Sequence, residues 1–397
     1  MSIKPMIRNN ICLNAHPAGC AASVLNQIEY VKKNMSKDTN SPKLVLVVGC
    51  SIGYGLASRI SAGFGYGAAT VGLSFENEPS EKRSGTPGYY NNETFDKEAE
   101  KSGLVSITLN GDAFSNEMKV KTAEAVKQAA EKAGIPAKID LFVYSIASPV
   151  RTDPKDGVMY KSVIKPIGSG ISGESLNMMD GTFGSFSIDP ATDEEISNTV
   201  KVMGGEDWEL WMDALDGKGL FSPQTRTVAY TYIGPESSWA IYKNGTIGKA
   251  KEDLERAGRD INNKFTNQNK IAGAWVSVNK ALVTRSSSVI PSIPLYLTCL
   301  FKIMKEMNLH EGCIEQIVRL YKDRLYSPDG KVAVDSENRI RIDDWEMRDD
   351  VQKAVAEKMK STNTENVYQV TDINGVKHDF LEVHGFDVAG VDYDKEV

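Results

Sequence analysis

Short runs of apolar residues alternate with amphipathic stretches along the first 150 residues of the chain. Such runs, rich in Val, Ile or Leu and bounded by polar segments, are typical of strands buried on both faces of a parallel sheet. The four runs cover residues 43–49, 69–75, 104–109 and 139–145. Between them, helical periodicity extends to Phe64, and a second helix is predicted from an N-cap at Ser115 to Ala133. This alternation predicts an α/β fold, a doubly wound parallel sheet of the Rossmann type with right-handed crossovers.

The pattern changes in the middle of the chain. Residues 150–192 are rich in Gly, Ser, Asp and Pro and are interpreted as an insertion over the carboxyl edge of the sheet, where such folds bind ligands. A helix is predicted over 193–215, and strands over 226–232 and 274–278 with a helix from about Thr246 between them. Three further helices are predicted at 291–307, 311–326 and 345–359. We therefore expect one elaborated domain, with two lobes as the alternative.

Composition narrows the choice of partner. The formal net charge is −7 and no segment is dense in Lys and Arg, so nucleic acid is excluded and a small molecule fits better. No stretch approaches the roughly 20 apolar residues of a membrane helix, and the N-terminus lacks the apolar core of a secretion signal, which predicts a cytoplasmic protein. The five cysteines form no C-x-x-C pair and the four histidines no H-x-x-x-H pattern, so neither disulfides nor a metal site are expected.

A glycine-rich loop directly follows the first predicted strand. Its sequence is Gly49-Cys50-Ser51-Ile52-Gly53-Tyr54-Gly55, with the spacing G-x-x-x-G-x-G, and a helix follows it. Glycine lets the backbone turn sharply and lets a pyrophosphate approach amide groups at the positive end of that helix. The loop is therefore predicted to bind the phosphates of a dinucleotide. The alternative is that the glycines serve only the strand-to-helix turn.

An acidic residue stands at the end of the second predicted strand. Glu76 lies about 20 residues past the loop, where a carboxylate can hydrogen-bond both ribose hydroxyls and repel a 2′-phosphate, so NADH is the expected cofactor. The alternative is a solvated glutamate, and the nearby Lys82 and Arg83 leave NADPH open. Asp112-Ala113 and Ile146-Ala147 follow the third and fourth strands, where contacts with adenine and the nicotinamide ribose are expected.

Tyr242 and Lys251 are the candidate catalytic pair, and their spacing is unusual. Short-chain dehydrogenases carry a Tyr and a Lys four residues apart, whereas nine separate these two. At about 100° per residue, an unbroken helix would place them on opposite faces. Asn244-Gly245 and Gly248 are predicted to break the helix. Tyr242 would then approach from a preceding turn, and Lys251 would project from the first turns of the next helix. Lys249 remains an alternative to Lys251.

Several motifs together resemble the trans-2-enoyl-CoA reductases and the related V-type enoyl-ACP reductases. Besides the glycine loop and the Tyr242-x8-Lys251 pair, the matching segments are 14–20, 147–154, 202–208, 230–235, 277–284 and 384–387, so the resemblance covers essentially the whole chain. It implies an extended fold similar to that of the short-chain dehydrogenases. It also implies NADH-dependent reduction of the carbon–carbon double bond of an enoyl thioester, carried by coenzyme A or acyl carrier protein, by a monomeric enzyme.

The resemblance also implies a role for each site residue. Tyr242 is the proton donor, Tyr232 contacts the substrate, and Lys251 holds the nicotinamide ribose and lowers the pKa of the tyrosine. A hydrogen bond from Tyr242 would stabilise negative charge that develops on the thioester oxygen. No metal is implied. The implied cofactor-binding set is Gly49, Cys50, Ser51, Ile52, Gly53, Tyr54, Phe75, Glu76, Asp112, Ala113, Ile146, Ala147, Lys251, Leu282, Val283 and Thr284.

Two other functions remain as alternatives. A short-chain-type ketoreductase or alcohol dehydrogenase would use a similar loop and tyrosine, but the long spacing from Tyr242 to Lys251 counts against it. A non-catalytic dinucleotide-binding protein would keep the loop and Glu76 but has no reason to retain both catalytic residues. The apolar segment 291–301 is interpreted as the start of a core helix, with an acyl-chain wall as the alternative. Within one domain over 1–397, the predicted parts are a dinucleotide-binding core at 43–150, a lid at 150–222, a catalytic segment at 226–290 and a helical region at 291–397.

Overall fold

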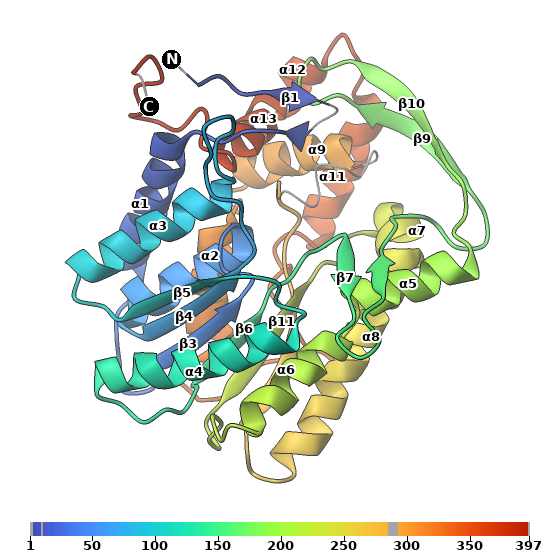
Figure 1. Ribbon diagram of the computed structural model, residues 1–397. Coiled ribbons are helices and arrows are strands. Elements are labelled where there is room, and N and C mark those ends of the chain that lie inside the picture. Colours follow the sequence, from blue (N-terminus) through green and yellow to red (C-terminus); the bar gives the residue numbers. More distant parts are fainter. Residues whose placement is uncertain (1–2, 9–10, 285–292, 396–397) are drawn as a thin grey trace.

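A seven-stranded parallel sheet forms the centre of the computed structural model, which describes residues 3–8, 11–284 and 293–395 (Figure 1). The strands lie in the order β5-β4-β3-β6-β11-β12-β13, and every neighbouring pair is parallel. The chain builds outward from β3 on one side and resumes with β6 on the other, so the doubly wound topology is confirmed. The strand bounds are β3 (Leu44–Val48), β4 (Ala69–Ser74), β5 (Ser106–Asn110), β6 (Leu141–Tyr144), β11 (Arg226–Thr231), β12 (Gly273–Val278) and β13 (Arg339–Arg341).

Helices cover both faces of the sheet. Consecutive residues of a strand point to opposite faces, so each strand contributes apolar side chains to the core on both sides. Leu44, Leu46 and Val48 pack with α4, α6 and α8, whereas Val45 and Val47 pack with the helices of the other face. The first group is α4 (Asn116–Ala133), α6 (Glu206–Asp216) and α8 (Thr246–Ile261), and the second is α1 (Pro17–Asn34), α2 (Gly53–Ile60), α3 (Pro87–Lys101) and α10 (Cys313–Leu320). The uninterrupted apolar runs are thus explained by burial on two sides.

Several predicted helices are confirmed and others need correction. The Ser115 side chain caps α4 by accepting from the Met118 N–H at 3.1 Å, as predicted. The helix predicted over 193–215 is two helices, α5 (Asp193–Met203) and α6, because the chain turns at Gly204 and Gly205. The helix predicted from Trp345 begins only at Asp349, as α11 (Asp349–Ser361). The sequence pattern missed α1, α3, β13, α12 (Val367–Val370) and α13 (Ile373–Glu382).

The insertion after β6 forms two antiparallel hairpins. β7 (Val150–Thr152) pairs with β8 (Met159–Lys161), and β9 (Ile171–Leu176) pairs with β10 (Phe183–Ile188). The second hairpin extends toward α12 (Figure 1), where Leu176 packs with Val367 and Ile373. Beneath it, α9 (Ile293–Glu306) packs against α11 and α13 in a third apolar cluster that includes Tyr242. The predicted helix start at Pro291 and the proposed end of the catalytic segment at 290 lie outside the described residues.

A short antiparallel hairpin, β1 (Ile7–Arg8) and β2 (Ile11–Cys12), precedes α1. None of the helices that the structure describes is both long and apolar enough to cross a membrane. The first and last parts of the chain meet, because the His16 N–H donates to the His384 carbonyl at 2.9 Å. The division into core, lid, catalytic and helical parts stays a prediction.

Candidate active site

The glycine loop lies at the carboxyl end of β3, where the strand order reverses. Gly49 has φ +88°, and a Cβ there would lie 2.0 Å from the Ser145 carbonyl oxygen at the end of β6. A Cβ on Gly55 would lie 1.8 Å from the Gly49 carbonyl oxygen. Only glycine permits these two approaches. The loop leads into α2, whose N-cap residue Ile52 provides no side-chain cap, so the first amides of the helix can receive an anion.

Glu76 follows β4 and points toward the same loop. Its Oε1 accepts a hydrogen bond from Ser51 Oγ at 2.6 Å, and its backbone is held by both amide atoms of Asn110, each at 2.8 Å. Gly88 at the start of α3 leaves room for the carboxylate, since a Cβ there would lie 2.3 Å from Oε1. Glu76 Oε2 is buried and has no hydrogen-bond partner among the described residues. An unsatisfied buried acceptor at a strand end fits the hydroxyls of an NADH ribose.

Other predicted cofactor residues line the same edge of the sheet. Phe75 is 77% exposed beside Glu76. The loop at Asp112-Ala113 after β5 is held firmly: Asp112 Oδ1 accepts from the Phe114 N–H at 3.0 Å, and the buried Lys119 donates to the Ala113 and Phe114 carbonyls at 3.2 and 2.9 Å. Ile146 and Ala147 follow β6, at the reversal of the strand order. The structure therefore brings these predicted residues together along one edge.

Tyr242 and Lys251 lie on different helices. Tyr242 ends α7 (Trp239–Tyr242), the backbone leaves the helical path before Thr246, and Lys251 stands in the second turn of α8. The Lys251 Nζ lies 4.7 Å from the centre of the Tyr242 ring and donates a hydrogen bond to the Tyr232 backbone carbonyl. The predicted broken helix is confirmed. Gly248, however, lies inside α8 and does not break it.

Gly248 has a different function in this arrangement. A Cβ at this position would lie 1.9 Å from the Lys243 carbonyl oxygen. The glycine therefore lets the end of α7 pass close to the first turn of α8, which brings the tyrosine and the lysine together. Lys249, the alternative lysine, is exposed and pairs with Glu252 at 2.8 Å on the outer face of α8. It therefore does not share the position of Lys251.

Tyr232 lies directly beside Tyr242, with ring centres 4.9 Å apart and ring planes at 90°. The Tyr232 hydroxyl donates to Glu346 Oε1 at 3.1 Å. The Tyr242 hydroxyl, by contrast, has no hydrogen-bond partner within residues 3–8, 11–284 and 293–395. The two hydroxyls thus differ: one is held by the protein, and the other is available to a ligand.

Burial dominates the electrostatics of this pair. Desolvation lowers the pKa of Lys251 to about 7, although the nearby Glu255 opposes the shift. Desolvation raises the pKa of Tyr242 well above its usual range, and the charge of Glu346 adds to this effect. The pKa of Tyr242 is thus raised overall, and the expected lowering of it by Lys251 stays a prediction. A buried phenol keeps its proton, and the buried lysine is readily deprotonated near neutral pH.

Three buried residues at this site were not among the site residues predicted from the sequence. Glu346, Tyr296 and Lys280 come from the β13–α11 turn, from α9 and from the segment after β12. Lys280 precedes the predicted cofactor residues Leu282 to Thr284, and its carbonyl accepts from the Tyr54 hydroxyl at 2.9 Å. No spacing rule connects residues so far apart in the chain. Only the packing of the last helices on the sheet brings them to the tyrosine pair.

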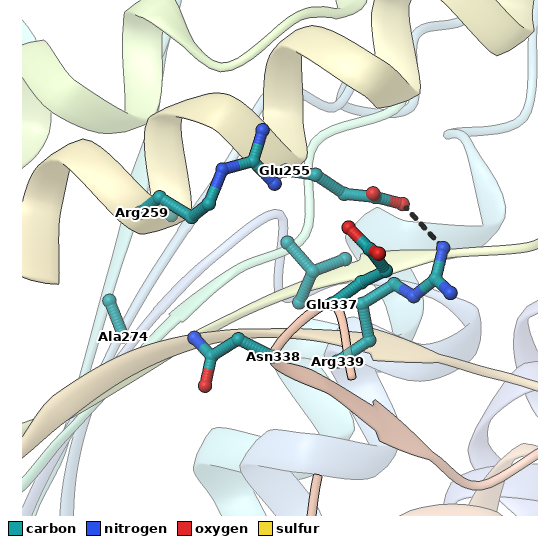
Figure 2. A pocket seen from close by; sticks show the side chains of 8 residues that line it. Glu255, Arg259, Ala274, Glu337, Asn338 and Arg339 are labelled. Atoms are coloured by element: carbon teal, nitrogen blue, oxygen red, sulfur yellow. Dashed lines mark hydrogen bonds and ion pairs between the residues drawn. The ribbon is translucent and has the colours of Figure 1, made fainter. Parts of the chain in front are cut away.

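Figure 2 shows a pocket elsewhere, between α8 and the strands β12 and β13. One wall carries an ion pair between Glu255 and Arg339, with 3.4 Å between nitrogen and oxygen. None of the predicted site residues lines it, so we do not assign the active site to this pocket. The lining residues are Glu255, Gly258, Arg259, Ala274, Val276, Glu337, Asn338 and Arg339.

The sequence matches three family models in consecutive segments. The model for the trans-2-enoyl-CoA reductase catalytic region matches residues 83–326, and that for the NAD(P)H binding domain of trans-2-enoyl-CoA reductase matches 2–81. A model described as the enoyl reductase FAD binding domain matches 334–397. The described turn between β13 and α11, residues 342–348, contains no glycine, so it does not provide the glycine-rich strand-to-helix turn that binds the pyrophosphate of a flavin dinucleotide.

Similar proteins cover the whole chain. The trans-2-enoyl-CoA reductase [NADH] of Treponema denticola is 56% identical over 100% of this chain and 98% of its own. The enoyl-[acyl-carrier-protein] reductase [NADH] of Flavobacterium johnsoniae is 50% identical over 99% and 96%. The crystal structure of the Treponema enzyme with NAD superposes with a TM-score of 0.94 over 100% and 98% of the two chains at 56% identity. That of the Clostridium acetobutulicum enzyme with NADH gives 0.95 over 100% and 98% at 43% identity. The chain belongs to the NADH-dependent trans-2-enoyl-CoA and enoyl-ACP reductase family.

Proposed function

We propose that this chain uses NADH to reduce the carbon–carbon double bond of trans-2-enoyl thioesters, with Tyr242 as the acid and Lys251 as its partner. One observation carries the assignment of the acid: the Tyr242 side chain is buried and its hydroxyl is protonated and without a described hydrogen-bond partner, while the neighbouring Tyr232 hydroxyl is held by Glu346. A phenol in this position can donate to a substrate oxygen without first breaking a bond to the protein.

The cofactor site follows from the loops at the carboxyl edge of the sheet. We assign the pyrophosphate to Gly49 through Tyr54, the adenosine ribose to Glu76 beside Phe75, and the adenine to Asp112-Ala113. We assign the nicotinamide half to Ile146-Ala147, Lys251 and Leu282 through Thr284. The uncapped start of α2 supports the pyrophosphate assignment, and the Glu76 Oε2 that lacks a described hydrogen-bond partner supports the ribose assignment.

Bound NADH supplies the hydride that reduces the β-carbon. Negative charge then develops on the thioester oxygen, and Tyr242 stabilises that charge by donating a hydrogen bond to it. Tyr242 then gives its proton to the α-carbon and becomes a phenolate, and the high pKa of Tyr242 keeps the phenol protonated until that step. Lys251, whose ammonium nitrogen lies 4.7 Å from the centre of the Tyr242 ring, would return a proton to the resulting phenolate, since burial lowers the lysine pKa to about 7. Tyr232 positions the substrate beside Tyr242.

Relatives of similar identity are named for coenzyme A and for acyl carrier protein thioesters, so both carriers are candidates here. We propose that the enzyme acts as a monomer, as the resemblance to the V-type enoyl-ACP reductases implies. A cytoplasmic location is proposed from the need for NADH, and the free cysteines are compatible with a reducing compartment.

Steady-state NADH oxidation with crotonyl-CoA tests the function directly. We expect turnover with crotonyl-CoA and none with acetoacetyl-CoA, which offers a ketone in place of the double bond. The opposite preference would identify a ketoreductase. If the protein binds NADH but oxidises it with neither thioester, it is a non-catalytic dinucleotide-binding protein.

A further inference from the structure

Glu346 is a fully buried carboxylate in the turn between β13 and α11. Its Oε1 accepts from the Tyr232 hydroxyl at 3.1 Å and from the Tyr296 hydroxyl at 2.7 Å, and its Oε2 accepts from the Ala281 N–H at 2.7 Å. The three donors stand after β11, on α9 and after β12. A buried carboxylate is stable only when it is satisfied in this way.

Glu346 is itself held by further hydrogen bonds and charged neighbours. Gln352 on α11 donates through Nε2 to the Glu346 backbone carbonyl at 2.7 Å and to the Tyr296 hydroxyl at 3.1 Å. The buried Lys280 is the cation that opposes the burial-induced rise in the pKa of Glu346, and Asp343 adds to that rise. Glu346 is therefore fixed in position by side chains from several elements, as a group that aligns others must be.

The consequence for the catalytic pair runs through Tyr232. The Tyr232 ring meets the Tyr242 ring edge to face at 4.9 Å, and the Tyr232 backbone carbonyl accepts from Lys251. A carboxylate that holds the Tyr232 hydroxyl thereby fixes the ring that borders Tyr242. It also accepts the hydrogen bond that the Tyr232 hydroxyl donates, so that this phenol does not compete with Tyr242 for the substrate oxygen.

We propose that Glu346 is a positioning residue of the reductase, which orients Tyr232 against Tyr242 and makes Tyr242 the sole phenolic donor to the substrate. The proposal rests on the proposed function. Glu346 touches no reacting atom and acts through the Tyr232 hydroxyl. Its loss should therefore change turnover only as long as that hydroxyl is present.

The test is a double-mutant cycle with crotonyl-CoA and NADH, using Glu346→Gln, Tyr232→Phe and the combination. We expect Glu346→Gln to lower kcat about tenfold in the parent protein but less than about threefold in the Tyr232→Phe background. Asp344→Asn is the matched control, because Asp344 is an acid of the same turn whose carboxylate pairs with Arg319 and Arg324 and bonds to neither tyrosine. It should leave kcat unchanged.

A spectroscopic measurement separates positioning from activity. In protein labelled with 13C at the tyrosine ζ-carbon, the Tyr232 resonance is identified by its absence in Tyr232→Phe. Without any cofactor, Glu346→Gln should shift that resonance and Asp344→Asn should not, because the shift reports the hydrogen bond of the phenol.

The proposal is overturned if the kcat losses of Glu346→Gln and Tyr232→Phe multiply, or if Glu346→Gln is fully active with the resonance unmoved. If Glu346→Gln does not fold, a cycle between Tyr296→Phe and Tyr232→Phe replaces it, since Tyr296 shares Oε1 with Tyr232. Coupling of about threefold or more then supports the proposal, and multiplying losses reject it. If the parent protein fails to oxidise NADH with crotonyl-CoA, the proposed function has failed, whereas an active parent with a negative cycle rejects only the role of Glu346.

Discussion

Lys251 and Tyr242 are in contact, with the ammonium nitrogen 4.7 Å from the ring centre, although they stand on separate helices. The turn between α7 and α8 replaces the single helical turn that joins the corresponding pair in short-chain dehydrogenases. The geometry of the pair thus depends on how closely two helices approach, and substitutions that change this approach should affect catalysis without touching either residue.

Tyr242→Phe should lower kcat by roughly a hundredfold or more, because one transition-state donor is lost, while the Kd for NADH stays nearly unchanged. Tyr232→Phe should be milder and act partly on KM, since a positioning contact exists before the transition state. Steady-state kinetics with crotonyl-CoA and fluorescence titration of NADH check both variants. If Tyr242→Phe stays active while Tyr232→Phe is inactive, the two roles are reversed.

Gly248→Ala should destabilise the protein by about 2 kcal/mol or more, because its Cβ would meet the Lys243 carbonyl at 1.9 Å. The displaced α8 should also carry Lys251 away from Tyr242 and lower kcat about tenfold. Gly258→Ala in the same helix is the control, since its Cβ would meet Trp208 at an ordinary 3.4 Å. Urea unfolding measures the stability of both variants. If Gly248→Ala is as stable as Gly258→Ala, Gly248 does not approach the Lys243 carbonyl so closely.

Lys251→Met should change how stability depends on pH. The pKa of Lys251 is lowered to about 7 in the folded protein, so between that pH and the ordinary lysine pKa the unfolded chain binds more protons. The contribution of Lys251 to the free energy of unfolding therefore rises with pH over that window, with a limiting slope of about 1.4 kcal/mol per pH unit. Urea unfolding without NADH at pH 7, 8 and 9 should show the parent gaining stability relative to Lys251→Met. If the difference in unfolding free energy between the parent and Lys251→Met is the same at all three pH values, Lys251 is solvated in the folded protein.

Glu76→Ala should narrow the preference for NADH over NADPH, because it removes the charge that repels a 2′-phosphate. Ser51→Ala should have a smaller effect in the same direction, since Ser51 holds the carboxylate at 2.6 Å without supplying charge. The ratio of kcat/KM for the two cofactors measures both. A parent enzyme that already uses NADPH equally well would contradict the placement of Glu76.

Cys50→Ser should retain most turnover, although Cys50 lies within the phosphate loop. Burial raises the pKa of its thiol to about 11, and its Sγ faces Asn92 Oδ1 at 3.6 Å inside the protein. The thiol is therefore neither ionised nor aimed at a ligand. Loss of turnover with normal NADH binding and normal unfolding would instead indicate covalent chemistry.

The strands of the sheet, α4 and the glycine loop could be predicted because each leaves a local signature. Val45 and Val47 belong to an unbroken apolar run, and Ser115 and Gly134 mark the ends of one helix. α3 was missed because its buried face includes Asn91 and Asn92, which bond to Ser51 and Ser74 instead of packing as apolar residues do.

The site was predictable only where its residues are neighbours in sequence or match a family motif. Glu346 could not be found in this way, because its role depends on donors from three distant segments. Its neighbourhood was even predicted to be helical, whereas α11 begins only at Asp349. The role of such residues is set by long-range packing, and a single sequence offers no spacing rule that predicts this packing.

The position of β13 at the edge of the sheet has a consequence for how the enzyme matures during synthesis. The ribosome completes the glycine loop, Tyr242 and Lys251 before it reaches β13 and Glu346, and at ordinary elongation rates the interval is roughly 5 to 20 seconds. From the completion of β12 until β13 follows, β12 is an open edge that other nascent chains can pair with, and until Glu346 is made the hydroxyl of Tyr232 lacks its acceptor. A ribosome stalled in this window would therefore display the glycine loop, Tyr242 and Lys251 on a chain that is aggregation-prone and catalytically unfinished.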